Sequence, residues 1–295
     1  MSTTVTVPST DGVQLALHHL SDTSAGTLPI MLLSHATGFH GHCWIPIAQH
    51  LEGTFDCWAL DYRGYGDSTV PHDWQVRWPA YGEDATAVVQ YLTTHVNKAP
   101  LWAAGHSMGG ATLLMAAVNN PELFAGITAF EPIVFPQSGF RPADMPPNPL
   151  ATATRKRRAT FSSREEAFTN FSSKLPMNAF HPDALHAYVD YGFATQPDGS
   201  VSLKCNPEHE ARTYDTGGIH ETWNQLANIA TPTWVLGSTP QQYQVSDIAE
   251  QIASLLPHGH YEEWPELSHF GPLEDPARVA AFLASRPALE ELRDQ

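Results

Sequence analysis

The chain has 295 residues, 42% of them hydrophobic and only 16% charged, which is typical of a folded globular protein and excludes a disordered one. Its formal net charge of -16 argues against nucleic acid or an anionic membrane surface as partner, since both require basic patches. The one basic run, residues 155–158 (RKRR), is interpreted as a solvated helix face.

The predicted elements begin with two strands at 3–7 and 13–19 around the turn pair Asp11-Gly12, a pattern typical of a β-hairpin. Helical spacing of apolar residues predicts helices at 81–95 and 109–118. Further strands are predicted at 30–34, 55–60, 100–104, 126–130, 233–236 and 260–264. Because strands alternate with helices, we expect an α/β fold with a mostly parallel, doubly wound sheet.

The interval 135–230 breaks this rhythm. It is rich in proline and phenylalanine and has helical stretches but no convincing central strand. We interpret it as a helical cap inserted between two strands, so the catalytic core would comprise residues 1–134 and 231–295.

The sequence gives no sign of a targeting or membrane segment. The N-terminal stretch lacks the basic start and apolar run of a signal peptide, and no apolar run reaches the ~18 residues of a membrane span. Cys43, Cys57 and Cys205 cannot all pair and have no metal-binding spacing. We therefore expect a cytoplasmic protein that does not contact a membrane and needs no metal or organic cofactor; its oligomeric state is left open.

Residues 105–110 (GHSMGG) contain G-x-S-x-G between a predicted strand and a predicted helix, the context that makes this motif specific. The residues two positions from a serine on so tight a turn must be small, and Gly105 and Gly109 meet that demand. Ser107 would project above the sheet edge as a nucleophile. The N–H of Met108, at the helix start, would donate to a developing oxyanion.

A serine hydroxyl is a weak nucleophile until a base takes its proton. Among the 16 histidines, His269 lies in the loop after the last predicted strand and before the final helix. The nucleophile then precedes the histidine along the chain, which is the order that G-x-S-x-G hydrolases show.

Four segments together resemble the α/β-hydrolase superfamily: HATGF at 35–39, DYRGYGDS at 61–68, GHSMGG at 105–110 and SHFGPLEDP at 268–276. The resemblance implies the α/β-hydrolase fold and an esterase- or lipase-like serine hydrolase with a cap. It implies that Ser107 forms an acyl-enzyme and that His269 transfers the protons. The loop 35–38 lies where relatives carry a His-Gly-x turn, so the resemblance also implies the N–H of Thr37 as second oxyanion donor.

The acid of the triad departs from the family pattern. Relatives usually place it just after the strand that follows the cap, but residues 237–242 contain no carboxylate. Asp247, further along, is more simply a helix N-cap or first-turn residue. Glu131 directly follows the strand 126–130, where some members of the superfamily have their acid, and a strand end is a costly place for an unpaired charge. We expect Glu131 to hold His269, with Asp247 or a triad without a strong acid as alternatives.

The sequence therefore predicts a carboxylesterase-like serine hydrolase for a small or medium, mainly apolar acyl substrate. Hydrolysis of a carbon–carbon bond, thioester or lactone, and cofactor-free perhydrolysis, remain open with the same triad. A receptor of this fold that binds a ligand without turnover is a further alternative.

Overall fold

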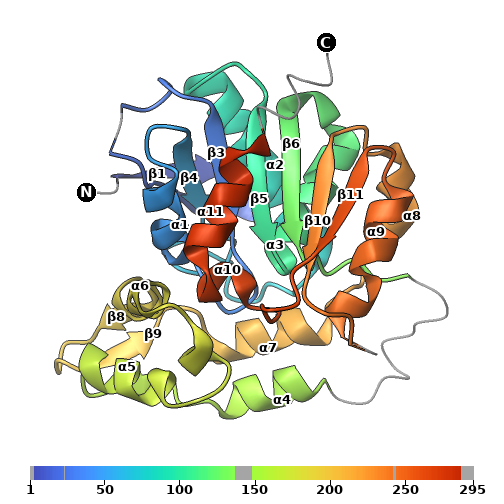
Figure 1. The fold of residues 1–295 in the computed structure, drawn as a ribbon. Coiled ribbons are helices and arrows are strands. Elements are labelled where there is room, and N and C mark those ends of the chain that lie inside the picture. The colour runs from blue at the N-terminus through green and yellow to red at the C-terminus, as the bar shows by residue number, and fades with distance from the viewer. Residues whose placement is uncertain (1–2, 23, 137–147, 242–243, 287–295) are drawn as a thin grey trace.

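The computed structural model describes residues 3–22, 24–136, 148–241 and 244–286. Within them, eight strands form one sheet in the order β1-β2-β4-β3-β5-β6-β10-β11 (Figure 1). Strand β2 runs antiparallel to β1 and β4, and every other neighbouring pair in this sheet is parallel. The predicted mostly parallel α/β sheet is thus confirmed, as is the hairpin at its N-terminal edge.

The sheet strands are β1 Thr3–Pro8, β2 Gln14–His19, β3 Ile30–Ser34, β4 Asp56–Leu60, β5 Leu101–His106, β6 Phe124–Phe130, β10 Thr233–Gly237 and β11 Gly259–Glu263. The helices around them are α1 Ile45–His50, α2 Trp78–His95, α3 Met108–Asn119, α8 Thr222–Gln225, α9 Ala249–Leu255, α10 Gly271–Glu274 and α11 Pro276–Ala284. The strands and the two helices with predicted bounds, α2 and α3, agree with the predictions to within a few residues.

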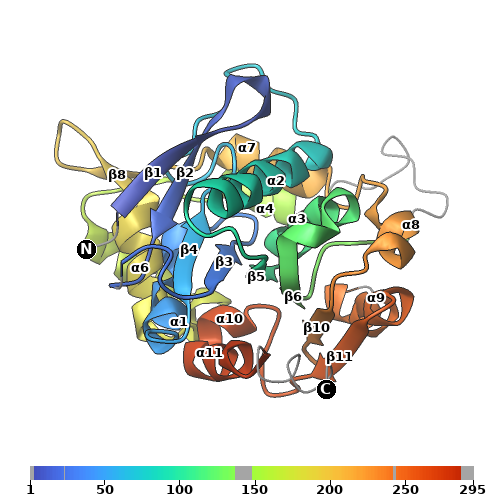
Figure 2. The same cartoon turned by 90° about the horizontal axis from the view of Figure 1, so that it is seen from above.

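Two apolar cores lie on the two faces of the sheet, and the strand period decides which residue enters which core. In β3, Ile30 and Leu32 belong to the core that includes residues of α2, α3 and α9, whereas Met31 and Leu33 belong to the core that includes residues of α1 and α11. All five residues of β3 are buried, because helices cover both faces (Figure 2). This explains why the central strands read as continuous apolar runs.

Between β6 and β10 the chain leaves the sheet and forms a separate layer at the ends of the parallel strands (Figure 1). Its elements are α4 Pro149–Lys156, β7 Thr160–Phe161, α5 Arg164–Ser172, α6 Pro182–Gly192, β8 Phe193–Thr195, β9 Val201–Leu203 and α7 Pro207–Asp215. The helices were expected, but the small antiparallel sheet β7-β9-β8 was not. Strands of two or three residues are too short to give a periodic signal in the sequence.

None of the helices in the described part of the chain combines the length and apolar character that crossing a membrane requires.

Candidate active site

Ser107 occupies a strained turn between β5 and α3. Its backbone angles are φ 56° and ψ −113°, a region that residues other than glycine rarely adopt. A Cβ atom on Gly105 would lie 2.5 Å from the carbonyl carbon of Gly109, and one on Gly109 would lie 2.1 Å from the Ser34 carbonyl oxygen. The turn therefore demands glycine on both sides of the serine, as the motif predicted.

Glu131 lies at the end of the neighbouring strand β6 and contacts His269. The His269 Nδ1 atom is 2.6 Å from Glu131 Oε2. Because a carboxylate only accepts hydrogen bonds, Nδ1 carries the proton and Nε2 is left to accept one. The other carboxylate oxygen, Oε1, accepts hydrogen bonds from the Ser238 amide at 2.7 Å and the Ser238 hydroxyl at 2.6 Å.

These contacts keep Glu131 ionised although the residue is only 1% exposed. Burial by itself raises the pKa of the carboxyl, but the hydrogen bonds from His269 and Ser238 outweigh it and hold the pKa below its usual value. Glu131 is therefore an ionised acceptor at neutral pH, held on both oxygens.

Asp247 lies elsewhere. It is exposed in the first turn of the 3-10 helix Val245–Ile248, whose N-cap is Gln244, so of the two roles expected for it, N-cap or first-turn residue, the structure shows the second. Of the two candidate acids, the fold brings Glu131 to His269. Ser238 was not foreseen, although the signal was available: it follows β10, which lies beside β6 with Leu236 opposite Phe130.

His106, the residue before the candidate nucleophile, also contacts the histidine loop. Its Nε2–H donates to the His269 carbonyl oxygen at 2.7 Å, and the two rings lie 4.9 Å apart. Burial lowers the pKa of His106 well below its ordinary value, so it stays a neutral donor. His106 thus packs beside the site and ties the His269 backbone to β5.

A cavity of about 730 Å³ connects the candidate residues, since Ser107, His269, Glu131 and Thr37 all line it. Within the described residues no hydrogen bond joins the Ser107 hydroxyl to the His269 ring; such contacts are often long before a substrate binds. Met108, the other predicted oxyanion donor, is the first residue of α3 and fully buried.

Most individual residues of the cavity wall were not identified from the sequence. Its apolar lining includes Trp78, Ile133, Phe135, Leu150, Leu175, Pro176, Tyr214 and Phe270. The charged side chains that line it in the described residues are all acidic: Glu131, Glu266 and Glu274. The site therefore offers an apolar surface beside a serine and a histidine and, within the described residues, no cation to hold an anionic substrate.

The turn at 61–68, one of the four segments that resemble the superfamily, has a structural role. Asp61 accepts hydrogen bonds from the amides of Gly41 at 2.6 Å and Asp67 at 2.8 Å, and contacts His18 Nε2 at 2.9 Å. His18, Asp61 and Asp67 are close enough to hold a metal ion, but the Lys204 ammonium lies 2.7 Å from Asp67. Because the Lys204 ammonium already neutralises Asp67 and the oxygens of Asp61 already accept hydrogen bonds, these residues do not fit a metal site.

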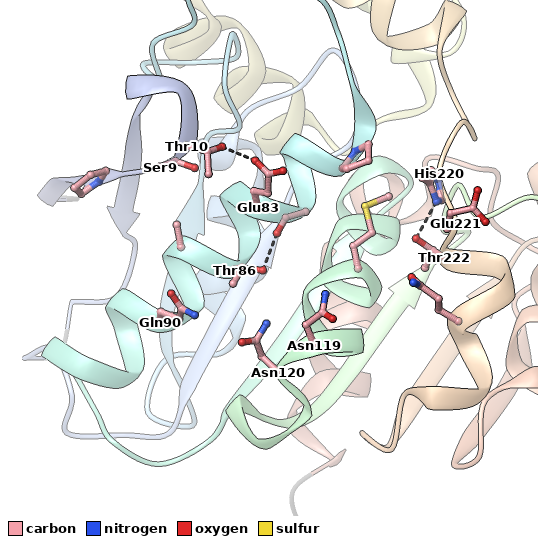
Figure 3. Close-up of a pocket in the computed structure, with 16 residues that line it drawn as sticks. Ser9, Thr10, Glu83, Thr86, Gln90, Asn119, Asn120, His220, Glu221 and Thr222 are labelled. Carbon is pink, nitrogen blue, oxygen red and sulfur yellow. Dashed lines mark hydrogen bonds between the residues drawn. The ribbon is translucent and has the colours of Figure 1, made fainter.

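A second cavity of about 740 Å³ lies between α2 and α3, beside His220 (Figure 3). Two pairs of its polar side chains are hydrogen-bonded, Thr10 with Glu83 and His220 with Thr222 (Figure 3). None of the candidate active-site residues lines it. The two cavities have similar volumes, so volume does not identify the active site. The cavity that contains Ser107 and His269 is the candidate because of the residues in its wall.

The model of the "Alpha/beta hydrolase family" matches residues 31–282. Monoglyceride lipase of Mus musculus is 29% identical over 110 residues, and protein phosphatase methylesterase 1 of Debaryomyces hansenii is 24% identical over 157 residues. These matches cover 36% and 49% of this chain, and only 35% and 38% of the relatives' lengths.

Solved structures resemble the whole chain. A peroxisomal alpha-beta-hydrolase of Saccharomyces cerevisiae superposes with a TM-score of 0.78 at 17% identity, covering 99% of this chain and 89% of that one. E-2-(acetamidomethylene)succinate hydrolase gives a TM-score of 0.75 at 18% identity, covering 97% and 98%. At such identities the likeness concerns the fold alone.

Proposed function

Since the chain belongs to the alpha/beta hydrolase family, we propose that it is a serine hydrolase that cleaves carboxylic esters through an acyl-enzyme. One observation carries the proposal. Ser107, on a strained turn, shares a cavity with His269, whose Nδ1–H is held by the buried carboxylate of Glu131. A nucleophile, a base and a group that orients the base are the parts that acyl transfer requires.

In the proposed mechanism the Ser107 hydroxyl attacks the ester carbonyl while His269 Nε2 takes its proton. The N–H groups of Met108 and Thr37 stabilise the oxyanion of the tetrahedral intermediate. His269 then protonates the departing alcohol, and the acyl group stays on Ser107. A water molecule that gives its proton to His269 attacks the acyl-enzyme, and collapse of the second intermediate returns that proton to Ser107 and releases the acid.

Glu131 keeps Nε2 directed toward the substrate and stabilises the imidazolium that forms in each step. It acts through hydrogen bonding and charge, with no proton transferred to it. Every step uses side chains and backbone of this chain and water, so we propose a cofactor-independent reaction.

We further propose that residues 135–230 form the cap of the site. Leu150, Leu175 and Tyr214, all from this segment, line the same cavity as Ser107. Their apolar surfaces support a small or medium, uncharged acyl group as substrate.

Cys43, Cys57 and Cys205 are buried and unpaired, which supports the cytoplasmic location that we propose.

The proposal is tested by hydrolysis of p-nitrophenyl esters from acetate to decanoate. We expect turnover by the wild type and loss of turnover to background in Ser107→Ala, because no other group supplies the nucleophile. Ser254→Ala, an exposed serine in α9, is the matched control and should behave as the wild type. A wild type that hydrolyses none of these esters would refute ester hydrolysis and favour carbon–carbon cleavage or ligand reception.

A further inference from the structure

We propose that the inserted segment completes the oxyanion hole, with Glu210 and Tyr214 of α7 acting as positioning residues for the loop 36–39 that carries the Thr37 amide. This inference rests on the proposed function. The loop follows β3, and three consecutive residues in it, Thr37, Gly38 and Phe39, each contact the inserted segment.

Phe39 is the first contact. It is buried, and its ring lies 6.0 Å from that of Phe180 and 5.5 Å from that of Tyr188, both within the inserted segment. The side chain at the end of the loop is therefore packed in the apolar core of the inserted layer and not in that of the sheet.

Gly38 is the second contact. Its φ of +86° favours glycine, and a Cβ atom there would lie 2.7 Å from Glu210 Oε1. The carboxylate of Glu210 thus occupies the space where any other residue would carry its side chain. The backbone of the loop and the α7 carboxylate limit each other's position.

Glu210 is itself fixed. It is 3% exposed, and its oxygens face the Arg157 guanidinium at 3.1 Å and 2.5 Å. Arg157 belongs to the basic run 155–158 that was interpreted as a solvated face, but its side chain is only 23% exposed. A buried carboxylate that lost this partner would be strongly destabilised, so the pair holds Glu210 against the loop.

Thr37 is the third contact. The Tyr214 hydroxyl donates to the Thr37 carbonyl oxygen at 3.4 Å, while the Tyr214 carbonyl accepts a hydrogen bond from the Asn148 side chain at 2.9 Å. Tyr214 also lines the cavity that contains Ser107. Helix α7 thus holds the peptide that follows the proposed oxyanion donor.

A shift of this loop would move the Thr37 amide away from the oxyanion, which exists only in the tetrahedral states. The predicted result is a loss of transition-state stabilisation with little change in substrate binding. A residue that only supports the fold would instead change stability, or the Michaelis constant, without this selectivity.

The experiment compares Glu210→Gln and Tyr214→Phe with wild type. Glu208→Gln is the matched control, because Glu208 lies on the same helix but has a side chain that is 45% exposed and pairs with Arg155 and Arg212. We would measure kcat and KM for p-nitrophenyl butyrate, and Ki for a trifluoromethyl ketone that mimics the tetrahedral state when Ser107 adds to it.

We expect Glu210→Gln to lower kcat about tenfold and Tyr214→Phe about threefold, with KM within about twofold of wild type. In both variants Ki should rise by the factor by which kcat/KM falls, because both report the same oxyanion contacts. Glu208→Gln should change neither quantity. Wild-type kcat and Ki in the α7 variants, or a rise in KM alone, would overturn the inference.

If Glu210→Gln fails to fold by circular dichroism, Tyr214→Phe decides by the same criteria, since it removes only a hydroxyl. A failure of the proposed function has a different signature: the wild type would show no Ser107-dependent turnover, and the inference would fall with it.

Discussion

At the scale of single residues, the pairing of Glu131 with His269 is the arrangement on which the proposed chemistry depends most. Glu131 is one of the residues with positive φ, at 43°, directly after β6. This bend lets its carboxylate face both His269 and Ser238. The carboxylate thus comes from β6, while the strand β10 that usually supplies it contributes Ser238 as the hydrogen-bond donor that holds it.

We expect Glu131→Gln to lower kcat for p-nitrophenyl butyrate on the order of 10³-fold. The amide keeps the size of the carboxyl but removes the charge that stabilises the imidazolium, and it can present a donor to Nδ1 and favour the wrong tautomer. Steady-state kinetics would measure the loss. Asp247→Asn is the control and should retain wild-type kcat; a large loss there with little loss in Glu131→Gln would reverse the assignment.

At the scale of elements, the turn from β5 into α3 is shaped by close approach of backbone. Gly109, in the first turn of α3, lies against the carbonyl of Ser34 at the end of β3, where a Cβ atom would be 2.1 Å from the oxygen. Gly110 has more room, and a Cβ atom there would lie 3.1 Å from the nearest atom, the Cβ of Pro132. The two adjacent glycines therefore differ in how well each position can accept a side chain.

We predict that Gly109→Ala is destabilised by about 3 kcal/mol or more, because a backbone contact of this kind can be relieved only by moving β3 or α3. Gly110→Ala should cost about 1 kcal/mol or less, since alanine favours the helix and the contact needs only a small shift. Urea unfolding of both variants would measure the difference. Equal stabilities would contradict this account of the turn.

At the scale of the whole molecule, burial lowers the pKa of several of the 16 histidines. Burial lowers the pKa of His35, His209 and His220 to about 4 in each case. His220 is an example: Nε2 lies 2.8 Å from the Ile133 carbonyl oxygen and Nδ1 lies 2.9 Å from the Thr222 hydroxyl, and burial of the ring disfavours its charged form. Protonation of such a ring opposes the folded state.

We therefore predict that the free energy of unfolding begins to fall at a higher pH than the pH at which carboxylates bind protons. A histidine with a lowered pKa binds its proton more readily in the unfolded chain, so its contribution is complete above about pH 6.5 and is lost as pH falls toward 4. Each such ring adds up to about 1.4 kcal/mol per pH unit. Burial raises the pKa of Glu210 and Asp84, which partly offsets the slope.

Urea unfolding at pH 7.5, 6 and 5 would measure this slope. His220→Gln should flatten it, whereas His72→Gln should leave it unchanged, because the His72 side chain is 98% exposed. A free energy of unfolding that stays constant from pH 7.5 to pH 5 would refute the prediction.

The sequence by itself determined what local chemistry controls. Short apolar runs bounded by turn residues predicted the strands, and the pair of glycines around Ser107 predicted its turn. The limit on Gly105 is local, since a Cβ atom there would meet the backbone of Gly109, whereas the limit on Gly109 comes from Ser34 on another strand. It also indicated Ser107 and His269 as candidates, since each lies in a distinctive loop that follows a strand. Glu131 was preferred over Asp247 on an argument about burial at a strand end.

Only the tertiary structure decided which of these residues meet. Glu131 and His269 are separated by 138 positions, and Ser238 joins them because β10 pairs with β6. The cavity wall from Leu150, Leu175 and Tyr214 and the contact of Glu210 with Gly38 have no local signal, because they join residues of the segment between β6 and β10 to residues that lie far from them in the chain. Such contacts follow from the order of the strands and the path of the insertion, which local patterns do not contain.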